Sequence, residues 1–295
     1  MSADLLYQLS LCQVPYIGYV HAKMLAERFP SAQAVFCASQ RELECLEGIG
    51  TIRARSIKKF RDFNKAEKEI AFIRKYGIQT LFLKDDEYPR RLLDCYDPPT
   101  VLFYKGKANL NAAKILSVVG TRNSTDYGKQ VVEKLMRDFS ALNILIISGL
   151  ALGIDAIAHT AALENNLRTV GVVAHGLDTL YPPENTLLAR EILKDGGLLT
   201  EFPSNTKPDK HSFPSRNRIV AGISDATIII ESGIRGGSMI TADMASGYNR
   251  DVFAIPGRIA DAKSIGCNHL IRNNKAILLT EASQLNEIMG WSGVN

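Results

Sequence analysis

The spacing of apolar residues divides the chain into two parts. Up to about residue 75, apolar residues recur at helical spacing, as in Leu5, Leu6 and Leu9, and no strand pattern interrupts them. From about residue 78, short runs rich in Val, Ile and Leu alternate with segments of helical periodicity. The sequence therefore predicts a group of short helices followed by a β-α sheet.

The second part alternates strands and helices as a doubly wound α/β fold does. Its central β-rich runs are almost continuous Val, Ile and Leu, which is typical of parallel strands covered on both faces. Right-handed crossovers then place helices on both faces, and ligands bind at the carboxyl ends of the strands. We expect strands at 78–83, 115–120, 144–149, 169–174, 198–202, 226–231, 252–256 and 276–280, and helices at about 127–142, 153–165, 184–195, 214–223, 239–248 and 266–273.

These elements predict a division into domains. Residues 1–75 form a helical accessory domain, residues 111–295 form the α/β domain, and residues 76–110 connect them. The two consecutive prolines at 98 and 99 mark the approach to the sheet. Both larger parts lie within the usual domain size of about 50–250 residues, so each can bury a core of its own.

Composition excludes several classes of protein. The 295 residues are 46% hydrophobic and 22% charged, which is ordinary for a globular protein. No window approaches the roughly 20 apolar residues of a membrane span, and the amino terminus lacks the basic region of a signal peptide. The 5 cysteines are scattered and include no C-x-x-C pair, so we expect a reduced, cytoplasmic protein without a structural metal.

The net charge of +4 is unevenly distributed. Residues 1–110 hold 17 Lys and Arg against 13 Asp and Glu, whereas residues 111–295 hold 18 of each kind. The excess is greatest in residues 51–75, with nine basic and three acidic residues. Such a segment either steers a polyanion or forms a solvated helix face, and charge alone does not separate the two.

The helical part contains a weak internal repeat. Residues 14–22 and 46–54 share the pattern I-G-x-x-x-A, with Gly18 and Gly50 32 residues apart. The spacing resembles a pair of helix-hairpin-helix units, whose turns present backbone N–H groups to nucleic-acid phosphate. The glycines equally suit tight turns that only join helices. The second copy is the better match, and the candidate secondary nucleic-acid contact in it comprises Gly48, Gly50, Arg53, Arg55, Lys58 and Lys59.

Three predicted strand-to-helix turns are rich in small residues. They span residues 120–128, 148–155 and 231–241, and in a parallel sheet such turns meet at one edge. Free N–H groups and helix dipoles at these turns bind anions, so phosphate is the expected ligand. Arg122 lies within the first turn, where its guanidinium can hold phosphate through paired hydrogen bonds.

Cofactor and catalytic motifs do not fit these turns. The chain has no G-x-x-x-x-G-K-[ST] sequence, and the strand after Gly120 does not end in the acidic residue of a dinucleotide site. Asp155 and His159 lie four residues apart on one helix face, but no third residue at useful spacing completes a metal site. We therefore expect no cofactor, no metal and no catalytic residue.

The segment from 201 to 222 combines prolines and cations with a single aromatic residue at its centre, Phe213. Its cations are Lys207, Lys210, Arg216 and Arg218. This combination suits single-stranded nucleic acid, because cations follow the phosphates and a ring stacks on an unpaired base. Alternatively, Phe213 anchors the loop in the core and the two arginines bind carboxylates.

A succession of sequence blocks in the second part is highly specific. The blocks are VGTRNSTDYG (119–128), SGLALGID (148–155), GLDTLYPPEN (176–185), EFP (201–203), FPSRNRIVAG (213–222), GGSMITA (236–242), VFAIPG (252–257) and SIGCNHLI (264–271). Together they resemble the DNA-processing protein A family (DprA, also called Smf), over about residues 110–282. The helical part fits the more variable accessory domain of that family.

The resemblance implies an extended Rossmann-like fold and a bacterial cytoplasmic protein that is not an enzyme. It also implies a homodimer that binds single-stranded DNA, protects it from nucleases and helps to load the RecA recombinase during natural transformation. Many relatives continue into a small winged-helix-like domain. Few residues follow Glu281, so we expect no such domain here.

The functional residues of the family transfer to matching positions. Arg122 corresponds to the arginine of the GTR block, Lys210 to the lysine before the FPSRNR block, and Phe213 to the aromatic residue that opens it. The resemblance implies that these three surround a pocket for phosphates and an extruded base. It further implies a lining of Gly120, Thr121, Ser148, Gly149, Arg216, Asn217, Arg218, Gly236, Gly237 and Ser238.

Two other functions fit parts of the sequence. Glycine-rich turns also serve enzymes that act on nucleotides or other small phosphorylated ligands, for which Asp155 and Glu231 are candidate carboxylates. Alternatively, the basic hairpin from Gly48 to Lys59 makes the protein a duplex-junction binder. The two alternatives assign the main site to different parts of the chain.

Overall fold

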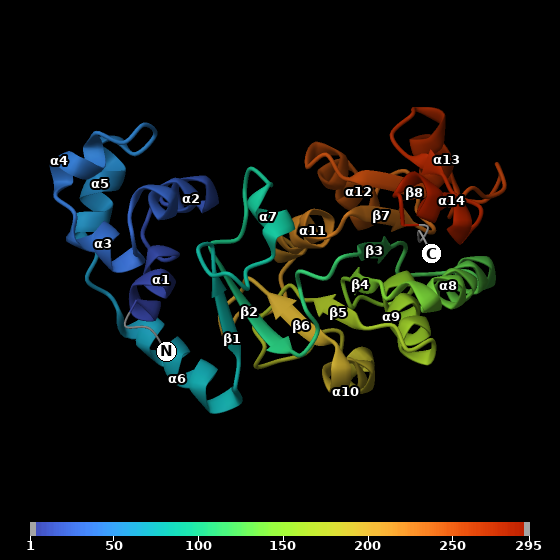
Figure 1. Cartoon of the computed structure of the whole chain (residues 1–295), viewed down its shortest axis with the longest axis horizontal. Helices are drawn as coiled ribbons and strands as arrows, with labels where there is room; N and C mark the ends of the chain where they lie inside the picture. Colours follow the sequence, from blue (N-terminus) through green and yellow to red (C-terminus); the bar gives the residue numbers. More distant parts are fainter. Residues whose placement is uncertain (1–3, 292–295) are drawn as a thin grey trace.

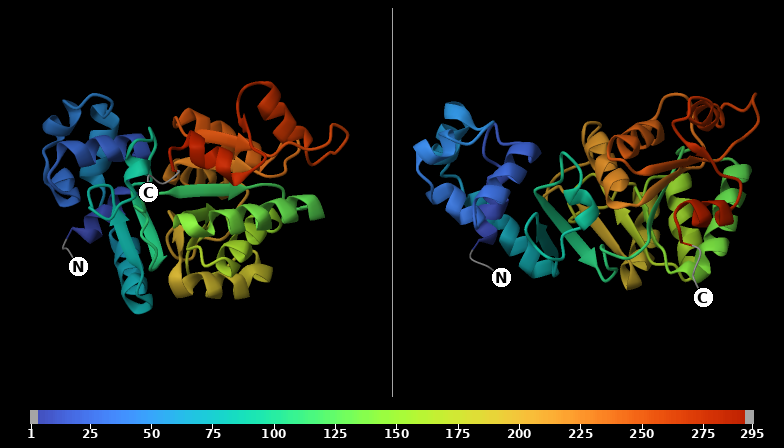
Figure 2. Two further views of the ribbon diagram at one scale, coloured as in Figure 1. Left: turned by 45° about the vertical axis from the view of Figure 1, so that its right-hand side comes forward. Right: turned by 45° about the horizontal axis from the view of Figure 1, so that its top comes forward.

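The computed structural model describes residues 4–291, in which a helical part leads into an α/β sheet. Figure 1 shows the first helices at one end of the molecule and the sheet beside them, with α6 (Asn64–Tyr76) leading into the sheet. Figure 2 shows the same separation from two further directions. The division at residues 75 and 110 stays a prediction.

The helical part packs around a small core of its own. Leu25, Leu43 and Ile57 are almost fully buried in it. The turn between α4 and α5 contains Gly48 and Gly50 with φ of +81° and +57°, a left-handed conformation that favours glycine. The helices before α6 are α1 (Leu5–Leu11), α2 (Tyr19–Arg28), α3 (Ala32–Cys37), α4 (Gln40–Glu44) and α5 (Gly50–Lys59).

The strands in residues 4–291 form one nine-stranded sheet with the order β1-β2-β6-β5-β4-β3-β7-β8-β9. All neighbours from β6 to β9 pair in parallel, so the predicted doubly wound, mostly parallel α/β fold is confirmed. The strands are β1 (Gln79–Phe82), β2 (Val101–Gly106), β3 (Ile115–Val119), β4 (Leu145–Ser148), β5 (Thr169–Val172), β6 (Gly197–Thr200), β7 (Ala226–Ile229), β8 (Asp251–Ala254) and β9 (Ile277–Leu278).

One strand, β2, was not predicted. Its sequence, VLFYKG, follows the two consecutive prolines and was assigned to the connecting segment. In the structure, β2 pairs antiparallel with β1 on one side and with β6 on the other. Residues 101 to 104 are all buried, so this strand contributes to the core of the sheet.

Helices cover both faces of the sheet. Apolar residues of α11 and α12 pack with one face, and those of α8, α9 and α14 pack with the other. Helices α8 to α13 lie close to the predicted ranges, whereas the short helices α7 and α14 were not predicted. They are α7 (Arg90–Leu93), α8 (Asp126–Phe139), α9 (Ile154–Glu164), α10 (Thr186–Asp195), α11 (Ser212–Ile223), α12 (Gly237–Gly247), α13 (Ile265–Arg272) and α14 (Ala282–Ile288).

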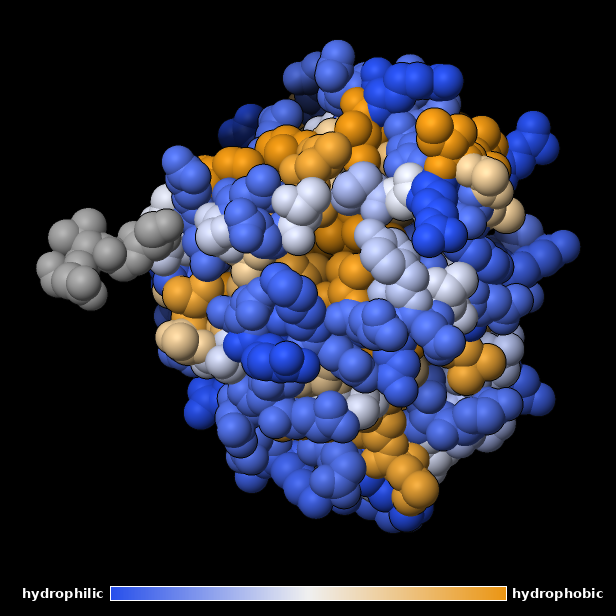
Figure 3. Space-filling view, turned by 90° about the vertical axis from the view of Figure 1, so that its right-hand side faces the viewer, coloured by the Kyte–Doolittle hydropathy of each residue, from blue (hydrophilic) through white to orange (hydrophobic). Residues whose placement is uncertain are grey.

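The surface of the α/β part mixes polar and apolar side chains. Viewed from the end opposite the helical part, hydrophobic side chains gather in several patches between polar ones (Figure 3). Between residues 4 and 291, no helix combines the length and the apolar character needed to cross a membrane.

Candidate nucleic-acid site

The three small-residue turns enclose one cavity at the carboxyl ends of β3, β4 and β7. The cavity has a volume of about 290 Å³, and Gly120, Gly149 and Gly237 each line it from a different turn. Close packing explains two of these glycines. An added Cβ at Gly120 would lie 2.6 Å from Ile154, and one at Gly149 would lie 2.6 Å from both Arg216 and Asp155.

Arg122 and Phe213 stand together in the wall of the cavity. The Arg122 guanidinium lies 5.1 Å from the centre of the Phe213 ring, within the range of a cation–π contact. The Tyr181 ring lies 6.1 Å from Phe213 on the loop after β5. Arg122 is exposed and Phe213 is half-buried, so a ligand can reach both a positive charge and an aromatic face.

A buried acid-base pair underlies the cavity. Arg216 is 5% exposed, and its Nη1 donates to the carbonyl oxygens of Gly149 and Val172. Burial raises the pKa of Asp155, and the positive charge of Arg216 opposes that rise. Because the two charges offset each other, the exposed side chain of Arg122 leaves the site positive.

Helix starts also face this region. α9 begins after Gly153, which has φ of +75° and lies against the backbone of Thr121 and Arg122. α12 begins at Gly237, and the hydroxyl of Ser238 in its first turn lies 2.8 Å from that of Ser232. The positive ends of these two helices favour an anion.

The structure brings most of the predicted site residues together. The cavity is lined by Gly120, Thr121, Arg122, Gly149, Phe213, Arg216, Asn217, Gly236, Gly237 and Ser238. Arg216 contributes mainly by holding the floor, since its hydrogen bonds go to backbone oxygens. As nucleic-acid contacts, all of these residues stay predictions.

Three predicted site residues lie outside the cavity. Ser148 is completely buried beneath it, and its hydroxyl donates to the carbonyl oxygen of Val118 over 2.7 Å. Lys210 is exposed in the loop that precedes α11. Arg218 points the other way, where it forms a buried salt bridge with Glu201.

The basic hairpin is only partly free to bind a ligand. Arg53 donates to the carbonyl oxygens of Tyr16 and Gly48, and Lys58 donates to two carbonyl oxygens at the end of α3. Arg55 and Lys59 are exposed, and neither has a polar partner among residues 4–291. Two of the four predicted cations therefore stabilise the helical part.

Sequence reasoning missed one cation of the cavity and one aromatic residue beside it. Arg235 is exposed in the third turn and adds a second free guanidinium to the lining. Tyr181 reaches Phe213 from the loop after β5, and no local pattern indicates this contact. Within the described part of the chain, no three His, Cys, Asp or Glu side chains group into a metal site.

The fold defines a Rossmann-like protein with an attached helical unit, and its cavity has the small-residue turns and the exposed arginine that suit an anion. Comparison with known families agrees, because residues 79–290 match the model of DNA recombination-mediator protein A and residues 5–70 match a helix-hairpin-helix motif. The chain belongs to the DNA recombination-mediator protein A family. It is 42% identical to the DNA processing protein DprA of Bacillus subtilis over 221 residues, which is 74% of each chain.

Other relatives extend the similarity over the helical part. The protein Smf of Synechocystis is 35% identical over 282 residues, covering 93% of this chain and 70% of the relative. The crystal structure of DprA from Streptococcus pneumoniae matches with a TM-score of 0.72 at 34% identity, covering 92% of this chain and 98% of that one. Helicobacter pylori DprA, whose structure describes a single-stranded DNA binding mode, matches with a TM-score of 0.66 at 31% identity, covering 72% and 96%.

Proposed function

We propose that this protein binds single-stranded DNA at the cavity between the three turns. The observation that carries the proposal is the exposed Arg122 guanidinium standing over the Phe213 ring beside the cavity. A strand requires both features at once, because its phosphates need positive charge and its unpaired bases need a flat apolar surface. Duplex DNA keeps its bases stacked and does not need the ring.

The proposed role is that of a mediator, not an enzyme. The protein protects incoming single strands and helps to load a RecA-type recombinase in DNA processing and natural transformation. This proposal rests on membership of the family and on the related DprA of Helicobacter pylori. Both candidate carboxylates have structural partners, since Asp155 lies beside Arg216 and Glu231 accepts the N–H of Thr125.

We further propose that the protein acts in the cytoplasm as a homodimer. Exposed apolar patches at the end of the α/β part support self-association (Figure 3). Residues 1–75 act as an accessory domain, and Lys210 joins Arg122 and Phe213 in holding the strand. Ser148 supports the site from inside the protein.

A competition experiment tests the proposed function. Fluorescent oligo-dT bound to the protein is displaced by unlabelled single-stranded DNA or by duplex DNA of equal length. The expected result is displacement by the single strand at much lower concentration than by the duplex. Equal displacement by both, or turnover of nucleoside monophosphates that Asp155→Asn abolishes, would favour another function.

A further inference from the structure

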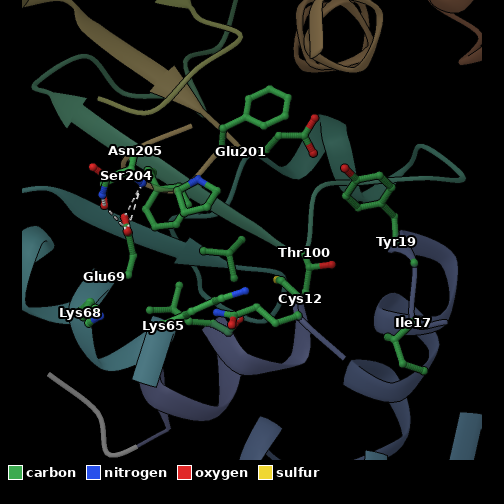
Figure 4. A pocket seen from close by; sticks show the side chains of 17 residues that line it. Cys12, Ile17, Tyr19, Lys65, Lys68, Glu69, Thr100, Glu201, Ser204 and Asn205 are labelled. Atoms are coloured by element: carbon green, nitrogen blue, oxygen red, sulfur yellow. Dashed lines mark hydrogen bonds between the residues drawn. The ribbon is translucent and has the colours of Figure 1, made fainter. Parts of the chain in front are cut away.

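A second and larger cleft separates the helical part from the sheet. It has a volume of about 760 Å³, and residues of α1, α2 and α6 line one wall while residues of β2 and the segment after β6 line the other. Figure 4 shows side chains from both walls around one space. The cleft lies away from the cavity of Arg122, because the two share no lining residue.

Two lysines supply the charge of this cleft. Lys65 and Lys68 are exposed, lie one turn apart on α6, and have no hydrogen-bond or ion-pair partner among residues 4–291. The residue four positions after Lys65 is Glu69, which would ordinarily pair with it along the helix. Glu69 instead accepts the N–H of Ser204 at 3.0 Å and its hydroxyl at 2.5 Å, so both lysines stay free.

The second acidic residue of the cleft, Glu201, is paired with an arginine. The side chain of Glu201 is 3% exposed and bonds through Oε2 to Arg218, and the Tyr19 ring lies 3.9 Å from the Arg218 guanidinium. The other oxygen, Oε1, is buried and accepts no hydrogen bond within the described chain. With Glu201 paired to Arg218, the two lysines outnumber the remaining carboxylate, Glu69, so the cleft carries net positive charge.

The walls between these groups include several apolar side chains. Leu9 is buried in the helical wall, and the other wall has the buried Val101 and Phe103 and the half-buried Phe202. One class of ligand suits these features. Such a ligand has an anionic group that contacts the lysines, a planar apolar part that packs along the walls, and an N–H group that donates to Glu201. A protein partner requires a broad surface of about 800 Å² on each side, which a two-walled cleft does not offer.

We propose that the interdomain cleft binds a nucleotide, with its base between the apolar walls and its phosphate on Lys65 and Lys68. The nucleotide is either a free nucleoside monophosphate or part of the strand held at the first cavity. This proposal deepens the proposed function, because in the second case the bound strand passes from Arg122 to the cleft. The volume of the cleft falls within the usual range of about 300–1,000 Å³ for small-molecule sites.

The test uses charge reversal in the full-length protein. Lys65→Glu and Lys68→Glu alter the cleft, and Arg74→Glu is the matched control, since Arg74 is exposed on the same helix outside the cleft. In one arm, calorimetry measures the binding of AMP and TMP to Arg122→Ala protein with and without each substitution. In the other arm, affinity is measured for short and long oligo-dT.

The proposal predicts a loss of about tenfold in at least one arm for both cleft variants and no change for Arg74→Glu. Weaker binding of AMP or TMP identifies the ligand as a free nucleotide. Weaker binding of long oligo-dT alone identifies it as a nucleotide of the strand. Wild-type binding by both cleft variants in both arms would overturn the proposal. If Arg122→Ala alone leaves oligo-dT binding intact, the cavity assignment fails independently of the cleft.

Discussion

The guanidinium of Arg122 lies 5.1 Å from the ring centre of Phe213, although the two residues belong to different crossovers of the sheet. Arg122 follows β3, and Phe213 lies in the first turn of α11, which follows β6. This juxtaposition gives one point of the surface both a charge for phosphate and a ring for a base. The proposed single-strand site depends on it.

Substitution of Phe213 separates stacking from apolar anchoring. Phe213→Ala is expected to weaken oligo-dT binding by about 1–3 kcal/mol without changing its salt dependence, because the ring contributes stacking and no charge. Phe213→Tyr keeps the ring and should bind as wild type does. Fluorescence anisotropy at several salt concentrations measures both quantities.

The variant Phe213→Leu distinguishes stacking on a base from apolar anchoring of the loop. A leucine fills apolar space but cannot stack on a base as a ring does. Weak binding by Phe213→Leu at normal thermal stability supports stacking. Wild-type affinity in that variant would show that Phe213 only anchors the loop.

Glycines of the cavity that lie against other side chains and glycines that do not should respond differently to substitution. Gly149→Ala places a Cβ 2.6 Å from Arg216 and Asp155, so the buried pair must move and both stability and DNA affinity should fall. Gly236→Ala meets no atom within 4 Å and is the matched control in the same cavity. Thermal unfolding and oligo-dT titration measure the two effects. Equal behaviour of the two variants would contradict the described packing.

Much of the α/β fold could be predicted from the sequence, because its central strands and helices have strong local patterns. The strand β2 could not, since its antiparallel partners β1 and β6 are set by tertiary pairing. The glycine-rich turns and Arg122 also carry a local signal. Arg218 does not, because its side-chain partner, Glu201, is recognisable only after the chain folds.

The buried histidine predicts a pH dependence of stability. His159 is fully buried, and its Nδ1 lies 2.6 Å from the hydroxyl of Thr169, which itself donates to the carbonyl oxygen of Ile146. Nδ1 is therefore the protonated nitrogen, and Nε2 is buried without a partner in the described chain. Burial, and then the charge of Arg216, lower the pKa of His159 from 6.5 to about 3.

His159 therefore stays neutral in the folded protein at pH values at which it is protonated in the unfolded chain. Stability should fall as the pH drops from about 6.5 toward about 3, by about 1.4 kcal/mol per pH unit from this group. His159→Gln should remove that component of the slope, whereas His211→Gln, at an exposed position, should not. Urea unfolding between these pH values gives the slopes. Identical slopes in wild type and His159→Gln would disprove the assignment.

The buried salt bridge between Glu201 and Arg218 should be costly to break. Glu201→Ala leaves the Arg218 charge buried without its partner, and the expected loss is about 3–5 kcal/mol in the free energy of unfolding. The control is Asp243→Ala, which breaks an exposed pair with Lys275 and should cost at most about 1 kcal/mol. Urea denaturation compares the two variants. A small effect of Glu201→Ala would show that water reaches Arg218.

The most direct test of the central claim is the salt dependence of oligo-dT binding by Arg122→Ala. The control is Arg137→Ala, which removes an exposed arginine on α8 away from the cavity. If Arg122 holds a phosphate, its removal should weaken binding about tenfold and reduce the slope of log affinity against log salt by about 0.7. Unchanged affinity and slope in Arg122→Ala would contradict the placement of the strand at this cavity.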